Sequence, residues 1–155
     1  MKNICPAPLL RSIRLAPLLG ALVSFTAFAQ TDAALAGAAK EKGAVVTPSG
    51  LVYLSIKDGT GASPTAADTV KVHYRGTFPD GREFDSSYKR GEAAQFPLAG
   101  VIPCWTEGVQ RMKVGGKAKL TCPASIAYGS RGAGKSVPPD AVLLFEVELL
   151  EITKR

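Results

Sequence analysis

The stretch IPCWTEGVQRMKVGGKAKLTC, Ile102 to Cys122, decides the fold, because it predicts one short helix followed at once by a strand. Pro103 suits the first turn of a helix, and the pair Gly115-Gly116 is expected to end it. One face of this helix is apolar, at Trp105, Val109 and Met112. The following residues alternate between polar and apolar, as in a half-buried strand, which turns Ala118, Leu120 and Cys122 inward. The helix therefore has a sheet to pack on.

The flanking sequence predicts further extended segments joined by short turns. These segments are Leu51–Lys57, Thr69–Phe78, Arg82–Ser87, Gln95–Ala99 and Ala141–Ile152. Turns such as PDG, at residues 79–81, are too short to return the chain to a parallel neighbour. The sequence therefore predicts an α+β fold, in which a curved antiparallel sheet of about five strands wraps one short α-helix as a half-barrel.

The first 29 residues differ from the rest in charge and in apolar content. Their charges are all positive, at Lys2, Arg11 and Arg14. An apolar run of 15 residues follows and ends in Ala27-Phe28-Ala29. This pattern is typical of a secretory signal peptide, and the run is shorter than the roughly 20 residues that span a bilayer. We expect residues 1–29 to be a signal peptide cleaved after Ala29, and the protein to be exported to the periplasm.

Removal of the signal would leave an alanine-rich segment and a single domain. We expect residues 30–45 to be a flexible tether, with a short dimerising helix as the alternative, and residues 46–155 to be the domain. The expected product is a monomer or a weak dimer. Its net charge falls from +6 to +3, because three cations leave with the signal. No arginine stripe interleaved with aromatic residues remains, so the sequence does not predict nucleic-acid binding.

Two cysteines, Cys104 and Cys122, remain after the expected cleavage. In an oxidising compartment they can form a disulfide, and two buried free thiols are the open alternative. Together with the single His73 they supply too few ligands for a structural zinc site. No metal and no cofactor are therefore expected.

The stretch GSRGAGKS, Gly129 to Ser136, matches the P-loop pattern of nucleotide-binding proteins. A P-loop needs a helix to leave directly after its lysine, whereas here Pro138 and Pro139 follow Lys135 closely. The match is therefore interpreted as a coincidence, and no nucleotide is expected. The stretch instead predicts a long glycine-bearing loop, and long loops on a small domain are usually functional.

Few residues offer covalent or acid–base chemistry, but aromatic and aliphatic bulk is plentiful at inward-facing positions. No serine or cysteine pairs with a histidine at a suggestive spacing, and no two carboxylates suggest an acid–base pair. Asp85 directly follows Phe84, and a carboxylate beside apolar bulk must be hydrogen-bonded or exposed. The sequence therefore predicts an apolar cleft with a few polar groups at its rim, as in a site for a small ligand or a peptide.

Three long stretches carry a family resemblance: VHYRGTFPDGREFDSS, FPLAGVIPCWTEGVQRMKVGGKAKLTCP and AYGSRGAGKSVPPDAVLLFEVELLEI. Together they resemble the FKBP-type peptidyl-prolyl cis–trans isomerases over about Val46 to Ile152. The resemblance implies a half-barrel around a short helix and a shallow pocket that takes a proline ring. It also implies a non-covalent isomerase that assists the folding of exported proteins.

The resemblance assigns roles to ten residues. It implies catalytic roles for Tyr74, Phe84, Asp85, Trp105, Tyr128 and Phe145, and substrate-binding roles for Phe96, Val101, Ile102 and Val137. Trp105 would form the pocket floor, the Ile102 backbone N–H would bind a substrate carbonyl, and Val137 would close the site from the loop. The chain departs from the family pattern at Ala94 and at the loop tip, residues 133–136.

The ligands implied by the resemblance are proline-containing unfolded or exported polypeptides, together with macrolide inhibitors. Lys135 is expected to be a solvent-facing charge that tunes which peptides enter. The alternative function is a non-catalytic chaperone or peptide-binding module on the same fold, which would hold unfolded chains without turning their bonds.

Overall fold

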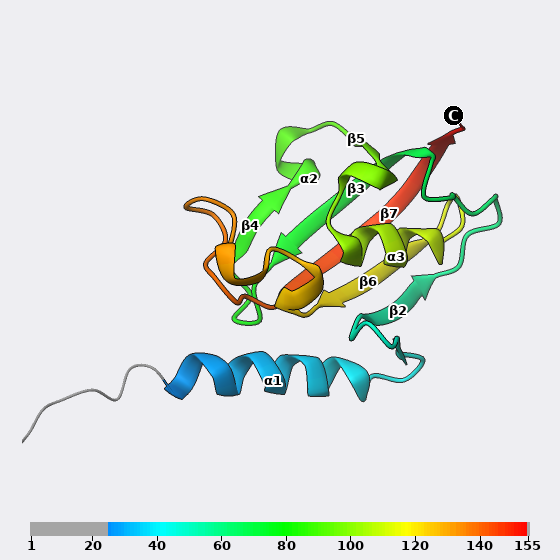
Figure 1. Cartoon of the computed structure of the whole chain (residues 1–155). Helices are drawn as coiled ribbons and strands as arrows, with labels where there is room; N and C mark the ends of the chain where they lie inside the picture. The colour runs from blue at the N-terminus through cyan, green and yellow to red at the C-terminus, as the bar shows by residue number, and fades with distance from the viewer. Residues whose placement is uncertain (1–24, 155) are drawn as a thin grey trace, which may run out of the picture.

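The computed structural model describes residues 25–154, in which strands form one sheet and helices lie on both sides of it (Figure 1). The α-helices are α1 (Phe25–Ala39), α2 (Ser87–Arg90) and α3 (Pro103–Gln110), and short 3₁₀ turns span Leu98–Gly100, Ala124–Ile126 and Gly129–Arg131. The strands are β1 (Val45–Val46), β2 (Val52–Lys57), β3 (Thr69–Thr77), β4 (Glu83–Ser86), β5 (Ala94–Pro97), β6 (Lys117–Cys122) and β7 (Leu143–Thr153).

The sheet is antiparallel throughout, with the strand order β1-β2-β6-β7-β3-β4. Strand β5 pairs with residues 69–72 of β3, whereas β4 pairs with residues 75–77 of β3. This confirms the predicted α+β class and the curved antiparallel sheet around a short helix. The sheet has seven strands instead of about five. The short strand β1 was not expected, whereas β5 overlaps the expected extended segment Gln95–Ala99.

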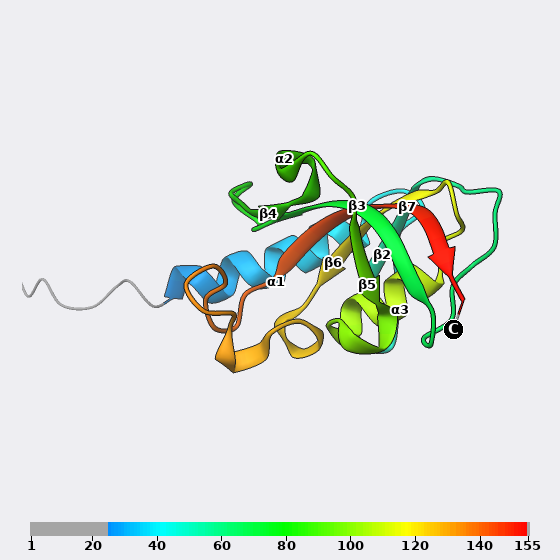
Figure 2. The same cartoon turned by 90° about the horizontal axis from the view of Figure 1, so that it is seen from above.

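The alternation predicted for the strands is confirmed by their burial. The inward side chains, all buried, are Val70, Val72, Tyr74, Ala118, Leu120, Cys122, Leu143, Phe145, Val147 and Leu149. Helix α3 lies across this face (Figure 2) and adds buried Trp105 and Val109, with Met112 just beyond its end. The core therefore sits between α3 and the concave face of the sheet.

Helix α3 ends at Gln110, before the Gly115-Gly116 pair that was expected to stop it. The chain then turns and attaches to β7: the Gly115 N–H donates to the Leu149 carbonyl at 2.8 Å, and the Leu149 N–H donates to the Gly116 carbonyl at 3.0 Å. Gly115 has a φ of +87°, which glycine adopts at little cost. The two glycines therefore serve the turn into β6.

The segment expected to be a flexible tether is largely helical, because α1 runs from Phe25 to Ala39. It lies against β2 and β6 on the face opposite α3 (Figure 2), where Ala38, Val52 and Thr121 are buried. An ion pair of 2.6 Å between Lys119 Nζ and Glu41 Oε1 ties the chain beyond the helix to β6. The helix spans the expected cleavage position after Ala29, and residues 1–24 of the expected signal lie outside the described residues.

None of the helices in residues 25–154 is long and apolar enough to cross a bilayer. Cys104 at the start of α3 and Cys122 at the end of β6 are joined by a disulfide, with their Cα atoms 5.9 Å apart. Both half-cystines have no exposed surface. Of the two alternatives for these thiols, the structure has the bonded one, and the bond ties α3 to the sheet.

Candidate functional site

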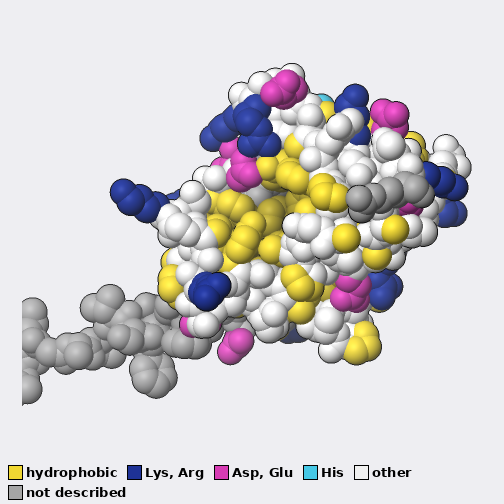
Figure 3. Space-filling model, turned by 45° about the horizontal axis from the view of Figure 1, so that its top comes forward, with side chains coloured by type: hydrophobic (Ala, Val, Ile, Leu, Met, Phe, Trp, Pro, Cys, Tyr) yellow, Lys and Arg dark blue, Asp and Glu magenta, His cyan; other side chains and the backbone are white. Residues whose placement is uncertain are grey.

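An apolar cleft of about 310 Å³ opens between α3, the sheet and the loop that follows β6. Figure 3 shows it as a hollow of hydrophobic side chains on this face of the molecule. Its lining residues are Tyr74, Phe84, Asp85, Phe96, Gly100, Val101, Ile102, Trp105, Tyr128 and Phe145. The structure thus brings together nine of the ten residues singled out from the sequence and adds Gly100, which no sequence signal marked.

Trp105 lies at the bottom of the cleft and is only 4% exposed. Three rings meet it edge to face: Tyr74 at a centroid distance of 5.2 Å, Phe145 at 5.4 Å and Phe96 at 5.6 Å. Edge-to-face contacts of this kind stabilise aromatic pairs beyond the area they bury. The floor is therefore a preformed apolar surface held by β3, β5 and β7.

Phe84 forms a wall of the cleft and is half-buried. Its ring packs edge to face on Phe145 at 5.6 Å and against Phe78 at 5.1 Å. It also lies over Gly76 of β3, where a Cβ atom would come within 2.5 Å of Phe84 Cζ and 3.1 Å of Phe145 Cε1. The Phe84 and Phe145 rings can pack at these positions only because residue 76 has no side chain.

The polar rim consists of a carboxylate held by two donors. The Tyr74 hydroxyl donates to Asp85 Oδ2. The Arg90 guanidinium donates to Asp85 Oδ1 at 2.5 Å and to the Tyr74 hydroxyl oxygen at 2.9 Å, and its carbon lies 5.5 Å from the centre of the Tyr74 ring. Arg90 belongs to this rim, and the sequence analysis did not single it out. The signal for it was Asp85 itself, whose position beside apolar bulk requires a partner such as a nearby cation.

Arg90 is positioned by the anchoring of α2 on β3. The buried Ser87 hydroxyl accepts the Tyr74 backbone N–H at 2.8 Å and shares a hydrogen bond of 3.0 Å with His73 Nδ1. The His73 ring stacks on Tyr88 at 4.8 Å. His73 therefore lies outside the cleft and supports the helix that carries Arg90.

Asp85 and Tyr74 titrate differently from free side chains. Burial raises the pKa of the Asp85 carboxyl, but the hydrogen bonds from Tyr74 and Arg90 outweigh burial and hold that pKa below its usual value. Burial, reinforced by the hydrogen bond to Asp85, raises the pKa of the Tyr74 phenol. At neutral pH the rim is therefore a charged carboxylate beside a neutral hydroxyl.

We expect Asp85 to make stability depend on pH in the acid range. Because its pKa is lowered by folding, its contribution is complete above the ordinary aspartate pKa of about 3.9 and is lost as the pH falls through the folded value. Urea midpoints measured between pH 2.5 and pH 6 should fall more steeply for the native protein than for Asp85→Asn. Asp58→Asn, an exposed carboxylate change outside the cleft, should retain the native acid limb. Identical curves for the native protein and Asp85→Asn would contradict this role.

Replacing Arg90 by methionine should weaken the rim without unfolding the domain. The ion pair is accessible to solvent, so the free energy of unfolding measured by urea denaturation should change little. The pKa of Asp85 should rise, which moves the acid limb of ligand binding to higher pH. The matched control is Lys89→Met, which removes the neighbouring cation that pairs with Glu83 outside the cleft. An unchanged pH profile for Arg90→Met would show that Arg90 does not position Asp85.

Val137 does not line the cleft, contrary to the expectation that it closes the site. It is 3% exposed and belongs to the buried core. The loop folds back on itself there: the Ala133 N–H donates to the Val137 carbonyl at 2.8 Å, and the Val137 N–H donates to the Ala133 carbonyl at 3.1 Å. This pairing turns the valine side chain inward. Within the described chain no helix follows Lys135, in keeping with the effect expected of Pro138 and Pro139.

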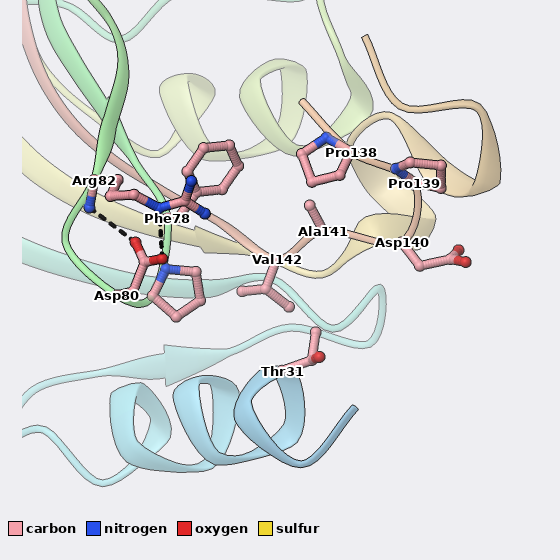
Figure 4. Close-up of a pocket in the computed structure, with 10 residues that line it drawn as sticks. Thr31, Phe78, Asp80, Arg82, Pro138, Pro139, Asp140, Ala141 and Val142 are labelled. Carbon is pink, nitrogen blue, oxygen red and sulfur yellow. Dashed lines mark hydrogen bonds and ion pairs between the residues drawn. The ribbon is translucent and has the colours of Figure 1, made fainter. Parts of the chain in front are cut away.

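A second hollow of about 300 Å³ lies between α1, the β3–β4 turn and the end of the same loop (Figure 4). Its lining residues are Thr31, Phe78, Pro79, Asp80, Arg82, Pro138, Pro139, Asp140, Ala141 and Val142. The polar groups on the turn are satisfied locally, because Arg82 pairs with Asp80 at 2.7 Å and its guanidinium lies over Phe78. Phe78, which lines this hollow, is in contact with Phe84, which lines the cleft. The cleft is the better candidate site because convergent polar groups stand at its rim.

Comparison with known proteins gives consistent matches. A family model described as FKBP-type peptidyl-prolyl cis-trans isomerase matches residues 61–150. FkpA, an FKBP-type peptidyl-prolyl cis-trans isomerase of Aeromonas hydrophila, is 59% identical over 120 residues, which are 77% of this chain and 44% of that protein. The FKBP-type 22 kDa peptidyl-prolyl cis-trans isomerase of Escherichia coli is 54% identical over 74% of this chain and 55% of its own.

Solved structures agree with these matches. The crystal structure of FkpA from Escherichia coli aligns with a TM-score of 0.80 and 46% identity, covering 83% of this chain and 60% of that one. A peptidyl-prolyl cis-trans isomerase from Pseudomonas syringae aligns with a TM-score of 0.76 and 34% identity, covering 83% and 94%. The chain spans about half the length of the first two relatives.

Proposed function

Since the chain belongs to the family of FKBP-type peptidyl-prolyl cis–trans isomerases, we propose that its aromatic cleft catalyses rotation about the peptide bond that precedes proline. The observation that carries the proposal is the cleft itself: an aromatic floor and walls with one hydrogen-bonded carboxylate at the rim. The substrates would be proline-containing segments of unfolded or exported polypeptides.

The chemistry requires no nucleophile. Rotation about a peptide bond breaks amide resonance against a barrier of roughly 18–20 kcal/mol, and the uncatalysed exchange at proline takes tens to hundreds of seconds. The planar amide has the larger dipole, so a water-free apolar cleft disfavours it more than the twisted amide. A cleft that also fits the twisted shape binds the transition state more tightly than the ground state.

Each part of the cleft has a role in this proposal. The proline ring lies on Trp105 between Phe84 and Phe145, which removes the adjoining amide from water. The backbone N–H of Ile102, the residue that precedes α3, donates to a substrate carbonyl. The Tyr128 hydroxyl, on a side chain that is 40% exposed, donates to the peptide from the opposite side. Asp85, held by Tyr74 and Arg90, orients the chain at the rim.

The test is isomerisation of a short peptide with a single X–Pro bond, together with proline-limited refolding of a model protein. We expect the native protein to accelerate both, and Tyr128→Phe to lower kcat/KM by about tenfold, as one lost charge-free hydrogen bond at the transition state would. Binding of the peptide without acceleration would favour the alternative, a non-catalytic peptide-binding module. Full activity of Tyr128→Phe would remove the hydroxyl from the mechanism.

The proposed place of action is the periplasm. Support comes from the signal-like pattern of residues 1–29 and from the buried Cys104–Cys122 disulfide, which suits an oxidising compartment. Cell fractionation and mass measurement of the purified N-terminus test both the location and the expected cleavage after Ala29. Recovery of an uncleaved chain in the cytosol would contradict this part of the proposal.

A further inference from the structure

The loop that borders the cleft, residues 129–139, carries two cations and no carboxylate. Its sequence is GSRGAGKSVPP, with Arg131 and Lys135 as its only charged residues. Both side chains are exposed. Neither forms an ion pair with any other residue of the described chain, whereas Arg90 on the opposite rim is engaged by Asp85. The loop therefore carries two cations that are not ion-paired.

Backbone hydrogen bonds hold this charge close to the cleft. The loop begins directly after Tyr128, which lines the cleft. The Gly132 N–H donates to the Tyr128 carbonyl at 3.2 Å, and the Asp140 N–H donates to the Gly129 carbonyl at 2.9 Å. Arg131 is three residues from Tyr128, so its Cα lies within roughly 11 Å of the Tyr128 Cα. Lys135 lies farther along the loop, within roughly 11 Å of Gly132, whose N–H bonds back to Tyr128.

The carboxylates near the loop offset this charge only in part. Asp85 is the only carboxylate among the cleft-lining residues, and it is hydrogen-bonded to Tyr74 and paired with Arg90. Asp140 directly follows the loop and is exposed, and it forms no ion pair with Arg131 or Lys135 in the described chain, so the segment 129–140 keeps a net charge of +1. Figure 3 shows Lys and Arg side chains on three sides of the apolar hollow. A bound peptide therefore leaves the cleft past a cationic rim.

We propose that Arg131 and Lys135 make the cleft selective for proline segments flanked by acidic residues. This inference rests on the proposed function of the cleft and names its substrate class. Charges separated by about one Debye length, which is about 10 Å at 0.1 M salt and about 30 Å at 0.01 M, attract an oppositely charged peptide measurably. Exposed pairs interact weakly, so the preference is expected to be about threefold to tenfold at low salt and to vanish near 1 M.

The experiment compares three peptides that share the core Ala-Leu-Pro-Phe and carry Glu-Glu, Gln-Gln or Lys-Lys beside it. Binding is followed by the fluorescence of Trp105, which is the only tryptophan and forms the floor of the cleft. For the native protein at about 10 mM salt, the Glu-Glu peptide should bind about threefold to tenfold more tightly than the Gln-Gln peptide, and the Lys-Lys peptide more weakly.

In the double variant Arg131→Gln/Lys135→Gln, the dissociation constants of the Glu-Glu and Gln-Gln peptides should become nearly equal. The matched control is Lys40→Gln/Lys42→Gln, which removes the same charge from exposed positions just beyond α1, on the face opposite α3. The control should keep the native ratio. If both double variants lose the preference for the Glu-Glu peptide equally, the preference comes from net charge and the proposal is wrong. The proposal is also overturned if the native protein shows no such preference at low salt. Isomerisation of the Gln-Gln peptide by the native protein tests the proposed function separately, because binding selectivity is read without turnover.

Discussion

Replacing Phe84 by alanine is expected to lower kcat/KM for a proline peptide by about 100-fold, which corresponds to about 2.7 kcal/mol of transition-state stabilisation. Phe84 is a wall of the cleft and contacts Phe78, which lines the second hollow. Without the ring, water enters beside the bound amide, and the advantage of the twisted, less polar state is lost. The measurement is a peptide isomerisation assay at substrate concentrations below KM.

The effect on folding should be much smaller, because Phe84 is only half-buried. We expect a loss of about 1–2 kcal/mol in the free energy of unfolding, measured by urea denaturation. Phe84→Leu, which keeps apolar bulk in the wall, should retain more activity than Phe84→Ala. Tyr53→Ala removes a half-buried ring of β2 that lies outside the cleft, and it serves as the matched aromatic control. Full activity of Phe84→Ala would refute the assigned role of this wall.

Removing the disulfide with Cys104→Ala/Cys122→Ala is expected to have the largest effect on stability. The bonded cysteines are 18 residues apart, and a loop of that size corresponds to about 3 kcal/mol in the chain-entropy description. For a domain of this size, the melting temperature should fall by about 10 °C. The measurement is thermal unfolding of the native protein and of the double variant at neutral pH.

Reductant supplies the internal control for this prediction. The native protein, unfolded and refolded in excess dithiothreitol, should melt at the temperature of the double variant, while the variant itself should not respond. Both half-cystines are fully buried, so the folded native protein should resist brief reduction. Equal melting temperatures for the oxidised native protein and the double variant would show that the bond contributes no stability.

The aromatic composition of the cleft was predictable from the sequence because its members occupy regular positions. Tyr74 and Phe145 lie on strands whose alternation is clear, so their inward direction follows from the period of the strand. Trp105 follows in the same way from the spacing along α3. The resemblance then gathered these residues, together with Phe84 and Tyr128, into one site.

Features that depend on tertiary contacts were not predictable in this way. Arg90 reaches Asp85 only because α2 turns back after β4 and is anchored by Ser87. Val137 faces the core because it pairs with Ala133 within an irregular loop, where no period fixes the direction of a side chain. After α3 the backbone bonds to distant parts of the chain: the Val114 N–H donates to the Ala62 carbonyl, and the Gly115 N–H donates to the Leu149 carbonyl in β7. The end of the helix therefore depends on contacts that helical spacing does not predict.

Gly76 has a consequence for protein engineering. It lies on β3 beneath Phe84 and Phe145, so a methyl group at position 76 would push these two rings toward the cleft. The cleft would change shape although no cleft-lining residue is replaced. A smaller side chain at position 84 would leave space for that methyl group. Gly76→Ala and Phe84→Leu thus form a compensating pair: the first substitution alone would weaken ligand binding, and the two together would admit a ligand of altered shape.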